Sequence, residues 1–273
     1  HLSIRRQRQM CIRDRGTAIT KEMLSSSAGY YTVSFLVPGN YRITVEKEGF
    51  KAVTRSGITL QVGQKMGLNF ALEVGAVAER VEVTGSAPLL QTQSVEQSQV
   101  VDRKQMEELP MNVRDFALLA TLQAGTIVGI GANNFANWYG TSTGHSLSTN
   151  GVPTDGNNWQ IDGVSNTDSM YGLIAVSPSL DAIQEFKVTS NNYAAEYGRV
   201  GGGSVQVQLR SGTNEFHGGA FEFLRNEKLD ANAFFNNRSG VPKKPYRQNQ
   251  FGALLGGPII KNKLFFFGDF EIL

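Results

Sequence analysis

The sequence predicts a mainly β chain in three parts: a small β-sandwich, a mixed α+β unit and a set of long C-terminal strands. Three observations lead to this class. Residues 29–74 alternate apolar and polar side chains almost without a break, which is typical of half-buried antiparallel strands. Two short helical patterns and a Gly- and Asn-rich stretch follow in residues 102–156. Residues 204–272 then return to alternation, now rich in Phe.

The first fifteen residues differ in composition from the rest. They contain five arginines and Cys11 but no apolar core of the length that a signal peptide needs. We expect residues 1–15 to be a non-native or disordered leader, with a native basic tail as the alternative. Without its five arginines and one aspartate, the totals of 26 basic and 24 acidic residues become 21 and 23, so the net charge changes from +2 to −2. The remainder has no basic stripe, which argues against a nucleic-acid partner.

Residues 16–75 predict the β-sandwich. Turns are expected at Pro38–Asn40 and at Glu48–Gly49, between short strands that each bury one face. The sequence PGNYRITVEKEGF within this region resembles the core of the carboxypeptidase regulatory-like domain, a prealbumin-type sandwich. Despite its name, that resemblance implies no peptidase activity. The apolar positions fall in four runs, at residues 31–35, 41–45, 58–62 and 68–72.

The α+β unit is expected over residues 91–213. Asp102 is placed to cap one helix that ends before Pro110, and Asn112 to cap a second helix that runs through Leu122. Strands are expected at Trp159–Val164 and Ile183–Val188.

The next strand, at residues 205–209, alternates Val and Leu with Gln, which predicts one dry face and one wet face. After a turn, Phe221 and Phe223 point to one side of a second strand while Glu222 points to the other. Large aromatics opposite a charge are typical of a lipid-facing barrel wall. We therefore expect Phe221 and Phe223, with Phe265 and Phe267, to be exposed on that wall.

Residues 214–273 predict the start of a transmembrane β-barrel. The Lys261–Lys263 turn is short, as periplasmic turns of such barrels are. The chain has no run of about 18 apolar residues that could form a spanning helix, whereas a barrel strand needs only about 10 alternating residues. The three candidate strands are His217–Leu224, Gln248–Leu255 and Lys263–Ile272.

Several of these segments resemble one family. The passage YAAEYGRVGGGSVQVQLRSGTNEFHGGAFEF resembles the junction between plug and barrel in TonB-dependent outer-membrane receptors, and GGPIIKNKLFFFGDFE is similar to a barrel hairpin of their Oar-like branch. NVRDFALLATLQAG, QIDGV and LDAIQEFKV resemble plug signatures of that branch. The resemblance implies an N-terminal fragment: a β-sandwich, an α+β plug domain, and then the first strands of a transmembrane β-barrel.

The resemblance also implies a function. Such a receptor lies in the outer membrane, in contact with its lipid, with the plug and N-terminal domain on the periplasmic side. It binds an extracellular ligand and imports it with energy that TonB transmits from an inner-membrane complex. It needs no cofactor and catalyses no reaction on the ligand. The alternative is a non-transporting surface protein that serves adhesion, secretion or signalling.

Residues 76–90 are expected to be a linker that contains one short strand, Arg80-Val81-Glu82-Val83-Thr84. In the resembled family, a short extended motif before the plug is captured by TonB as an added strand. Val81, Val83 and Thr84 match this motif loosely, so they are the candidate TonB-interaction residues. A plain linking strand is the alternative.

Residues 125–156 are expected to be loops, because Gly, Asn, Ser and Thr dominate them. Aromatic faces beside amide groups suit sugars or peptides, and in the resembled family the apical plug loops face the extracellular ligand. Solvated loop residues without a ligand are the alternative. The candidate ligand-facing residues are Asn133, Asn134, Asn137, Trp138 and Tyr139.

No catalytic or metal site is predicted. Residues 140–144 satisfy the GxSxG pattern, but a nucleophile elbow needs a strand before it and a helix after it, and loop-like sequence flanks this one. Asp155, Asp162 and Asp168 faintly resemble a calcium loop, yet Asn166 stands where the bidentate Glu is required. The three histidines are too far apart in sequence for paired ligands on one helix.

Overall fold

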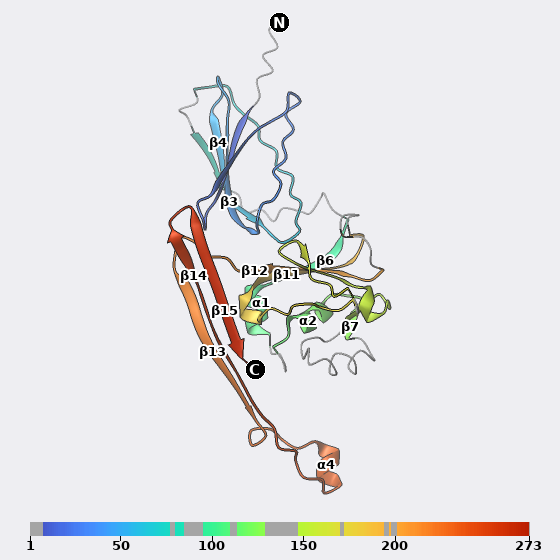
Figure 1. Ribbon diagram of the computed structural model, residues 1–273. Coiled ribbons are helices and arrows are strands. Elements are labelled where there is room, and N and C mark those ends of the chain that lie inside the picture. Colours follow the sequence, from blue (N-terminus) through green and yellow to red (C-terminus); the bar gives the residue numbers. More distant parts are fainter. Residues whose placement is uncertain are drawn as a thin grey trace.

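The computed structural model of the 273-residue chain describes residues 8–76, 80–84, 95–109, 114–128, 147–169, 172–193, 197 and 201–272. Three parts follow one another: a sandwich nearest the N-terminus, a mixed unit in the middle, and a long three-stranded sheet along one side of the mixed unit (Figure 1). Within the described ranges, no helix is long and apolar enough to cross a bilayer.

The sandwich is built on one five-stranded sheet with the order β2-β1-β3-β4-β5. Two extended segments, residues 31–36 and 66–72, pack their alternate side chains over this sheet, and the Tyr31 hydroxyl joins them by donating to the Leu68 carbonyl at 2.7 Å. The predicted run at 68–72 faces the core, and so do Tyr31 and Val33 of the run at 31–35, whereas Phe35 is 94% exposed. The structure assigns neither run as a strand. The strands are β1 (Gln9–Asp14), β2 (Thr20–Leu24), β3 (Gly39–Glu46), β4 (Ala52–Leu60) and β5 (Arg80–Thr84).

The predicted leader is wrong from residue 9 onward, because Gln9–Asp14 forms β1. This strand lies between β2 and β3 and pairs antiparallel with both. Met10 and Ile12 are 2% and 3% exposed in the sandwich core. Met10 and Ile12 alternate with polar residues and lie opposite Val45 and Ile43 of β3. The nearby arginines made this alternation difficult to recognise in the sequence.

The middle unit contains a second five-stranded sheet with the order β10-β9-β12-β11-β6. Its apolar core centres on Phe116, whose ring lies edge-on to Trp159 and Phe186 with centroids 6.4 and 6.1 Å away. Its strands and helices are β6 (Gln97–Asp102), α1 (Arg103–Glu108), α2 (Phe116–Leu119), η1 (Ala120–Leu122), β7 (Thr126–Val128), β8 (Leu147–Thr149), η2 (Thr154–Gly156), β9 (Asn158–Ile161), β10 (Val164–Ser165), η3 (Leu180–Ala182), β11 (Ile183–Asn191) and β12 (Ser204–Leu209).

The helix caps agree with the sequence in one case of two. Asp102 caps α1 in a capping box with Gln105, as predicted. The second helix begins later than predicted, because Asp115 accepts a hydrogen bond from the Ala117 amide at 2.9 Å and so caps α2. Asn112, the predicted cap, lies outside the described residues.

Two other predictions about this unit need correction. The strand predicted at Trp159–Val164 is interrupted by Asp162 and Gly163, whose φ values of 50° and 79° form a turn that separates β9 from β10. The stretch predicted as loops, residues 125–156, contains the small β7–β8 sheet.

The three C-terminal strands are confirmed. They are β13 (His217–Asn226), β14 (Arg247–Ile260) and β15 (Leu264–Ile272), paired antiparallel in sequence order. Residues 261–263 form the short turn between β14 and β15, whereas the connection of residues 227–246 is long and contains α4 (Phe234–Arg238). In Figure 1, α4 lies at the end of this sheet that is remote from the sandwich.

Candidate functional site

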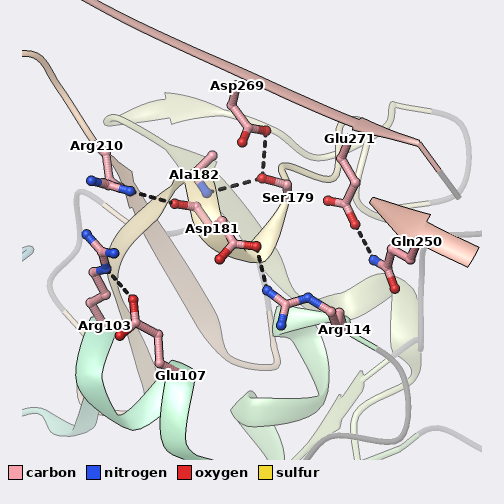
Figure 2. A network of polar contacts seen from close by, with 10 residues as sticks. All are labelled: Arg103, Glu107, Arg114, Ser179, Asp181, Ala182, Arg210, Gln250, Asp269 and Glu271. Atoms are coloured by element: carbon pink, nitrogen blue, oxygen red, sulfur yellow. Dashed lines mark hydrogen bonds and ion pairs between the residues drawn. The ribbon is translucent and has the colours of Figure 1, made fainter. Parts of the chain in front are cut away.

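The middle unit, which we call the plug, contacts the β13–β15 sheet, which we call the wall, through two arginines. Arg114 lies just before α2 and Arg210 just after β12, so both stand at ends of plug elements that face the wall. Figure 2 shows them in a polar network with Asp181, Ser179 and residues of β14 and β15. This network is the candidate functional site, because it holds the plug in place against the wall.

Arg114 joins an ion pair to an aromatic contact. Its Nη2 lies 2.5 Å from Asp181 Oδ2, and both side chains are less than one-fifth exposed. The guanidinium carbon lies 4.1 Å from the ring centroid of Phe223 and 5.3 Å from that of Phe221. A planar cation over an aromatic face is attracted by the ring quadrupole, and more strongly where water is partly excluded.

Arg210 makes a similar contact with an aromatic ring of β15. Its guanidinium carbon lies 5.3 Å from the Phe267 ring centroid, and Nη1 donates to the Asp181 carbonyl at 3.4 Å. Burial lowers the pKa of Arg210, and the neighbouring Arg103 charge lowers it further. The group stays cationic all the same, because an arginine side chain does not lose its proton in a protein.

A hydroxyl–carboxylate hydrogen bond also joins the plug to the wall. Ser179 Oγ donates to Asp269 Oδ2 of β15 at 2.6 Å and accepts from the Ala182 amide at 3.1 Å, which caps η3 (Figure 2). Within the wall, Gln250 donates to Glu271 on the same face. The inner face of the wall is therefore a mixture of aromatic and polar side chains that match the plug.

The predicted lipid-facing orientation of Phe221 and Phe223 is wrong, although Phe223 is 44% exposed. Their contacts with Arg114 place both rings on the plug side, and Glu222 lies on the outer side opposite Phe251. The contact of Phe267 with Arg210 places Phe267, and with it Phe265, on the plug side as well. The alternation was predicted correctly, but it could not show which face is covered. The outer face carries large apolar side chains that are 43% to 62% exposed, namely Leu224, Phe251, Leu255, Ile259, Leu264, Phe270 and Ile272.

Gly212 allows the junction between plug and wall to be close. A Cβ at this position would lie 2.7 Å from the Gly257 carbonyl oxygen and closer still to that of Phe266. Since both atoms belong to backbone, no side-chain movement could make room. Only glycine therefore permits the chain to pass from β12 into β13 at this distance.

The sandwich meets the same junction. The Asn214 amide donates to the Gly16 carbonyl at 3.1 Å, and the Asn262 amide donates to Asn214 Oδ1 at 2.8 Å. Asn262 lies in the short β14–β15 turn. All three parts of the chain thus come together at one asparagine.

The predicted TonB-interaction residues lie in β5. The backbone of Val81, Val83 and Thr84 pairs in parallel with Val53, Arg55 and Ser56 of β4. The segment is thus an edge strand of the sandwich sheet in addition to a linker. The candidate ligand-facing residues Asn133, Asn134, Asn137, Trp138 and Tyr139 lie outside the described residues, as does the GxSxG stretch.

Sequence reasoning missed Arg114, Asp181 and Arg210 as interface residues. Arg114 stands within NVRDFALLATLQAG and Asp181 within LDAIQEFKV, segments that were recognised only as plug signatures. Their pairing joins positions 67 residues apart. A single sequence carries no signal for such a contact.

Comparisons with known proteins agree with this geometry. The family model of the carboxypeptidase regulatory-like domain matches residues 10–73, and that of an outer membrane beta barrel domain matches residues 208–273. The chain is 30% identical over 260 residues to the TonB-dependent transporter Oar of Myxococcus xanthus, an alignment that covers 91% of the chain and 23% of that relative. The chain thus spans less than a quarter of the relative's length.

Two solved structures align with parts of the chain. The siderophore receptor PirA from Acinetobacter baumannii aligns with 69% of this chain and 26% of its own, at a TM-score of 0.46 and 20% identity. The outer membrane transporter YddB from Escherichia coli aligns with 59% of this chain and 24% of its own, at a TM-score of 0.44 and 14% identity.

A regulatory-like sandwich, a plug and an antiparallel wall with an apolar outer face together define a part of a plugged outer-membrane barrel protein. Over 91% of its length the chain is similar to Oar, a TonB-dependent transporter, and its two ends match a regulatory-like domain and an outer membrane beta barrel domain. The matched outer membrane beta barrel domain indicates that its place is the outer membrane.

Proposed function

We propose that the chain is the N-terminal part of a receptor that binds an extracellular ligand and imports it with energy transmitted by TonB. The observation that carries the proposal is the two-sided wall. Its inner face meets plug arginines, while its outer face exposes apolar side chains suited to outer-membrane lipid. Such a wall suits a barrel whose lumen is closed by the plug, so passage requires the plug to rearrange.

TonB, with its inner-membrane energising complex, is the proposed energy source. β5 is the last strand in the order of its sheet, so one of its two edges has no β-partner among the described residues. A free edge is what a partner strand needs for β-augmentation. We therefore place the TonB contact at Val81, Val83 and Thr84.

The extracellular ligand is proposed to contact Asn133, Asn134, Asn137, Trp138 and Tyr139. Amide groups beside aromatic faces suit a carbohydrate, a peptide or a metal chelate.

Uptake by the complete receptor tests the proposal. Cells that lack the receptor would be complemented with the wild type and supplied in turn with labelled oligosaccharides, peptides and ferric siderophores. We expect at least one pool to enter only when both receptor and TonB are present. Binding that persists without TonB, with no ligand entering in any strain, would instead favour adhesion, secretion or signalling.

A proline variant tests the TonB contact. Val83→Pro removes a backbone donor from β5, so capture of the receptor by the periplasmic domain of TonB should be lost. Ala76→Pro, outside any strand, is the matched control and should leave capture unchanged. Equal capture of both variants would mean that TonB binds the receptor outside β5.

A further inference from the structure

The polar face of the plug sheet is buried. Glu185 and Lys187 alternate with Phe186 along β11, and Gln206 of β12 pairs directly with Lys187. The opposite face packs the plug core, so this face would normally meet water. Yet Glu185, Lys187 and Gln206 are all less than one-tenth exposed. The predicted wet face of residues 205–209 is therefore wrong at Gln206.

A turn of the sandwich covers this face. The Val62 amide, just after β4, donates to Glu185 Oε1 at 2.5 Å across 123 positions of sequence. Burial raises the pKa of the Glu185 carboxyl, while the hydrogen bond from Val62 opposes that rise. The next residue, Gly63, has a φ of +61°, and a Cβ there would collide with the Gln206 side chain.

Lys187 joins three segments at one ammonium group. Its Nζ lies 2.5 Å from Glu96 Oε2 and donates to the Gly63 carbonyl at 3.3 Å. The side chains of Lys187 and Glu96 are 4% and 7% exposed, so the pair is held away from water. Lys187 thus links β11 to the sandwich turn and to the residue that precedes β6.

The position of Glu96 in the chain suggests a mechanical role for the Glu96–Lys187 ion pair. β6 is the edge strand of the plug sheet and is hydrogen-bonded there to β11. Along the chain, Glu96 lies between β5 and β6 and immediately precedes β6. A pull on the chain from β5 would therefore load the Glu96–Lys187 pair before it could peel β6 from β11.

We propose that the sandwich turn at Val62 and Gly63, with Glu96, Glu185 and Lys187, forms a latch that restrains β6 until TonB pulls. The sandwich supplies two of the groups that bind β11, the Val62 amide and the Gly63 carbonyl. The sandwich therefore helps to keep the plug in its closed arrangement. Release begins when Glu96 leaves Lys187. This inference rests on the proposed TonB-driven function.

Two variants of the complete receptor test the latch. Gly63→Leu changes only the sandwich and places a side chain where Gln206 lies, and Glu96→Gln removes the carboxylate from Lys187. Gly49→Leu is the matched control for the first, since Gly49 also has positive φ but has open space around its Cβ position. Glu108→Gln is the control for the second, because Glu108 forms an exposed pair with Lys104.

Amide hydrogen exchange of the purified receptor is the first readout. We expect exchange in residues 97–102 to be about tenfold faster in Gly63→Leu and Glu96→Gln than in their controls, because fewer contacts oppose local opening. Vancomycin sensitivity of cells is the second readout, since this antibiotic enters only through a large open pore. Both latch variants should sensitise cells that have TonB, and neither should sensitise cells that lack it.

The outcomes separate the latch from the transport proposal. Unchanged exchange in residues 97–102 in either variant that reaches the membrane would overturn the latch, whatever the receptor imports. Faster exchange without TonB-dependent sensitivity, in a receptor that does import, would also overturn it. Failure of the wild type to bind TonB would remove the transport proposal, whereas exchange would still show whether the sandwich restrains β6.

Discussion

The plug contacts its two neighbours through different chemistry. Toward the sandwich it uses a few deeply buried polar groups, above all Lys187, Glu96 and Glu185. Toward the wall it places the guanidinium groups of Arg114 and Arg210 over aromatic rings. A buried ion pair depends on both partners, since removal of one leaves the other charge without compensation. Arginine–aromatic contacts are individually weaker and are shared among several rings, so we expect the wall side to tolerate single changes better.

Removal of the wall should have the largest effect, which is on aggregation in water. Residues 1–273 should aggregate in water because the apolar outer face and the strand edges have no cover. Residues 1–211, which keep the sandwich and plug but not the wall, should give a monomer. Size-exclusion chromatography without detergent measures both. A monodisperse monomer of the 273-residue chain would show that the outer face does not require lipid.

Lys187→Ala should cause the next largest effect. It leaves the Glu96 carboxylate buried and unpaired, at a cost of about 3–5 kcal/mol in the free energy of local opening. Lys104→Ala, which breaks an exposed pair of side chains 3.9 Å apart, should cost about 0.5 kcal/mol or less. Hydrogen exchange of β6 and β11 in the complete receptor measures the difference. Equal effects of the two variants would mean that the sandwich side of the plug does not depend on the buried Lys187–Glu96 pair.

Arg114→Lys should have a smaller effect on the wall side. An ammonium keeps the charge near Asp181 but loses the planar stacking on Phe221 and Phe223, which we expect to cost about 1 kcal/mol. Arg225→Lys is the matched control, because Arg225 lies over the Tyr246 ring at 5.0 Å in a more exposed position. Exchange of α2 should rise only in the first variant. A loss as large as that of Lys187→Ala would mean that the wall side also depends on one residue.

Glu185→Gln should give the smallest effect, and the size of this effect depends on pH. Because the pKa of Glu185 is raised in the folded state, mainly by burial, its favourable contribution is present below the unfolded pKa and is lost as pH rises through the folded value. Asp102 adds to the rise, and the Lys187 ammonium lies on the same face. The amide of Gln can still accept from Val62, so the variant should gain about 2 °C in Tm at pH 7 and nothing at acidic pH.

Thermal unfolding of the complete receptor at several pH values measures this difference. Glu108→Gln, an exposed position, should show no such change with pH. A variant that is less stable than the wild type at pH 7 would mean that the charge of Glu185 itself stabilises the contact with the sandwich.

Local patterns in the sequence predicted elements whose residues are close together in the chain. Alternation indicated β12 to β15, and the Asp102–Gln105 spacing indicated α1 with its cap. β1 was missed because composition was given more weight than its short alternation. The two-residue period also cannot state which face of a strand is covered, which explains the errors at Phe221, Phe223 and Gln206.

The sequence by itself determined the class of this protein: a mainly β chain with a regulatory-like sandwich, a plug and the first strands of an outer-membrane barrel. Hydrophobic period, turns and caps act over a few residues, so they can be read without a structure. Only the tertiary structure decided that Arg114 and Arg210 face the aromatics of the wall and that the sandwich covers Glu185 and Lys187. Those contacts join residues that are between 57 positions (Arg210 and Phe267) and 124 positions (Gly63 and Lys187) apart. Burial of a charge also depends on everything that packs around it.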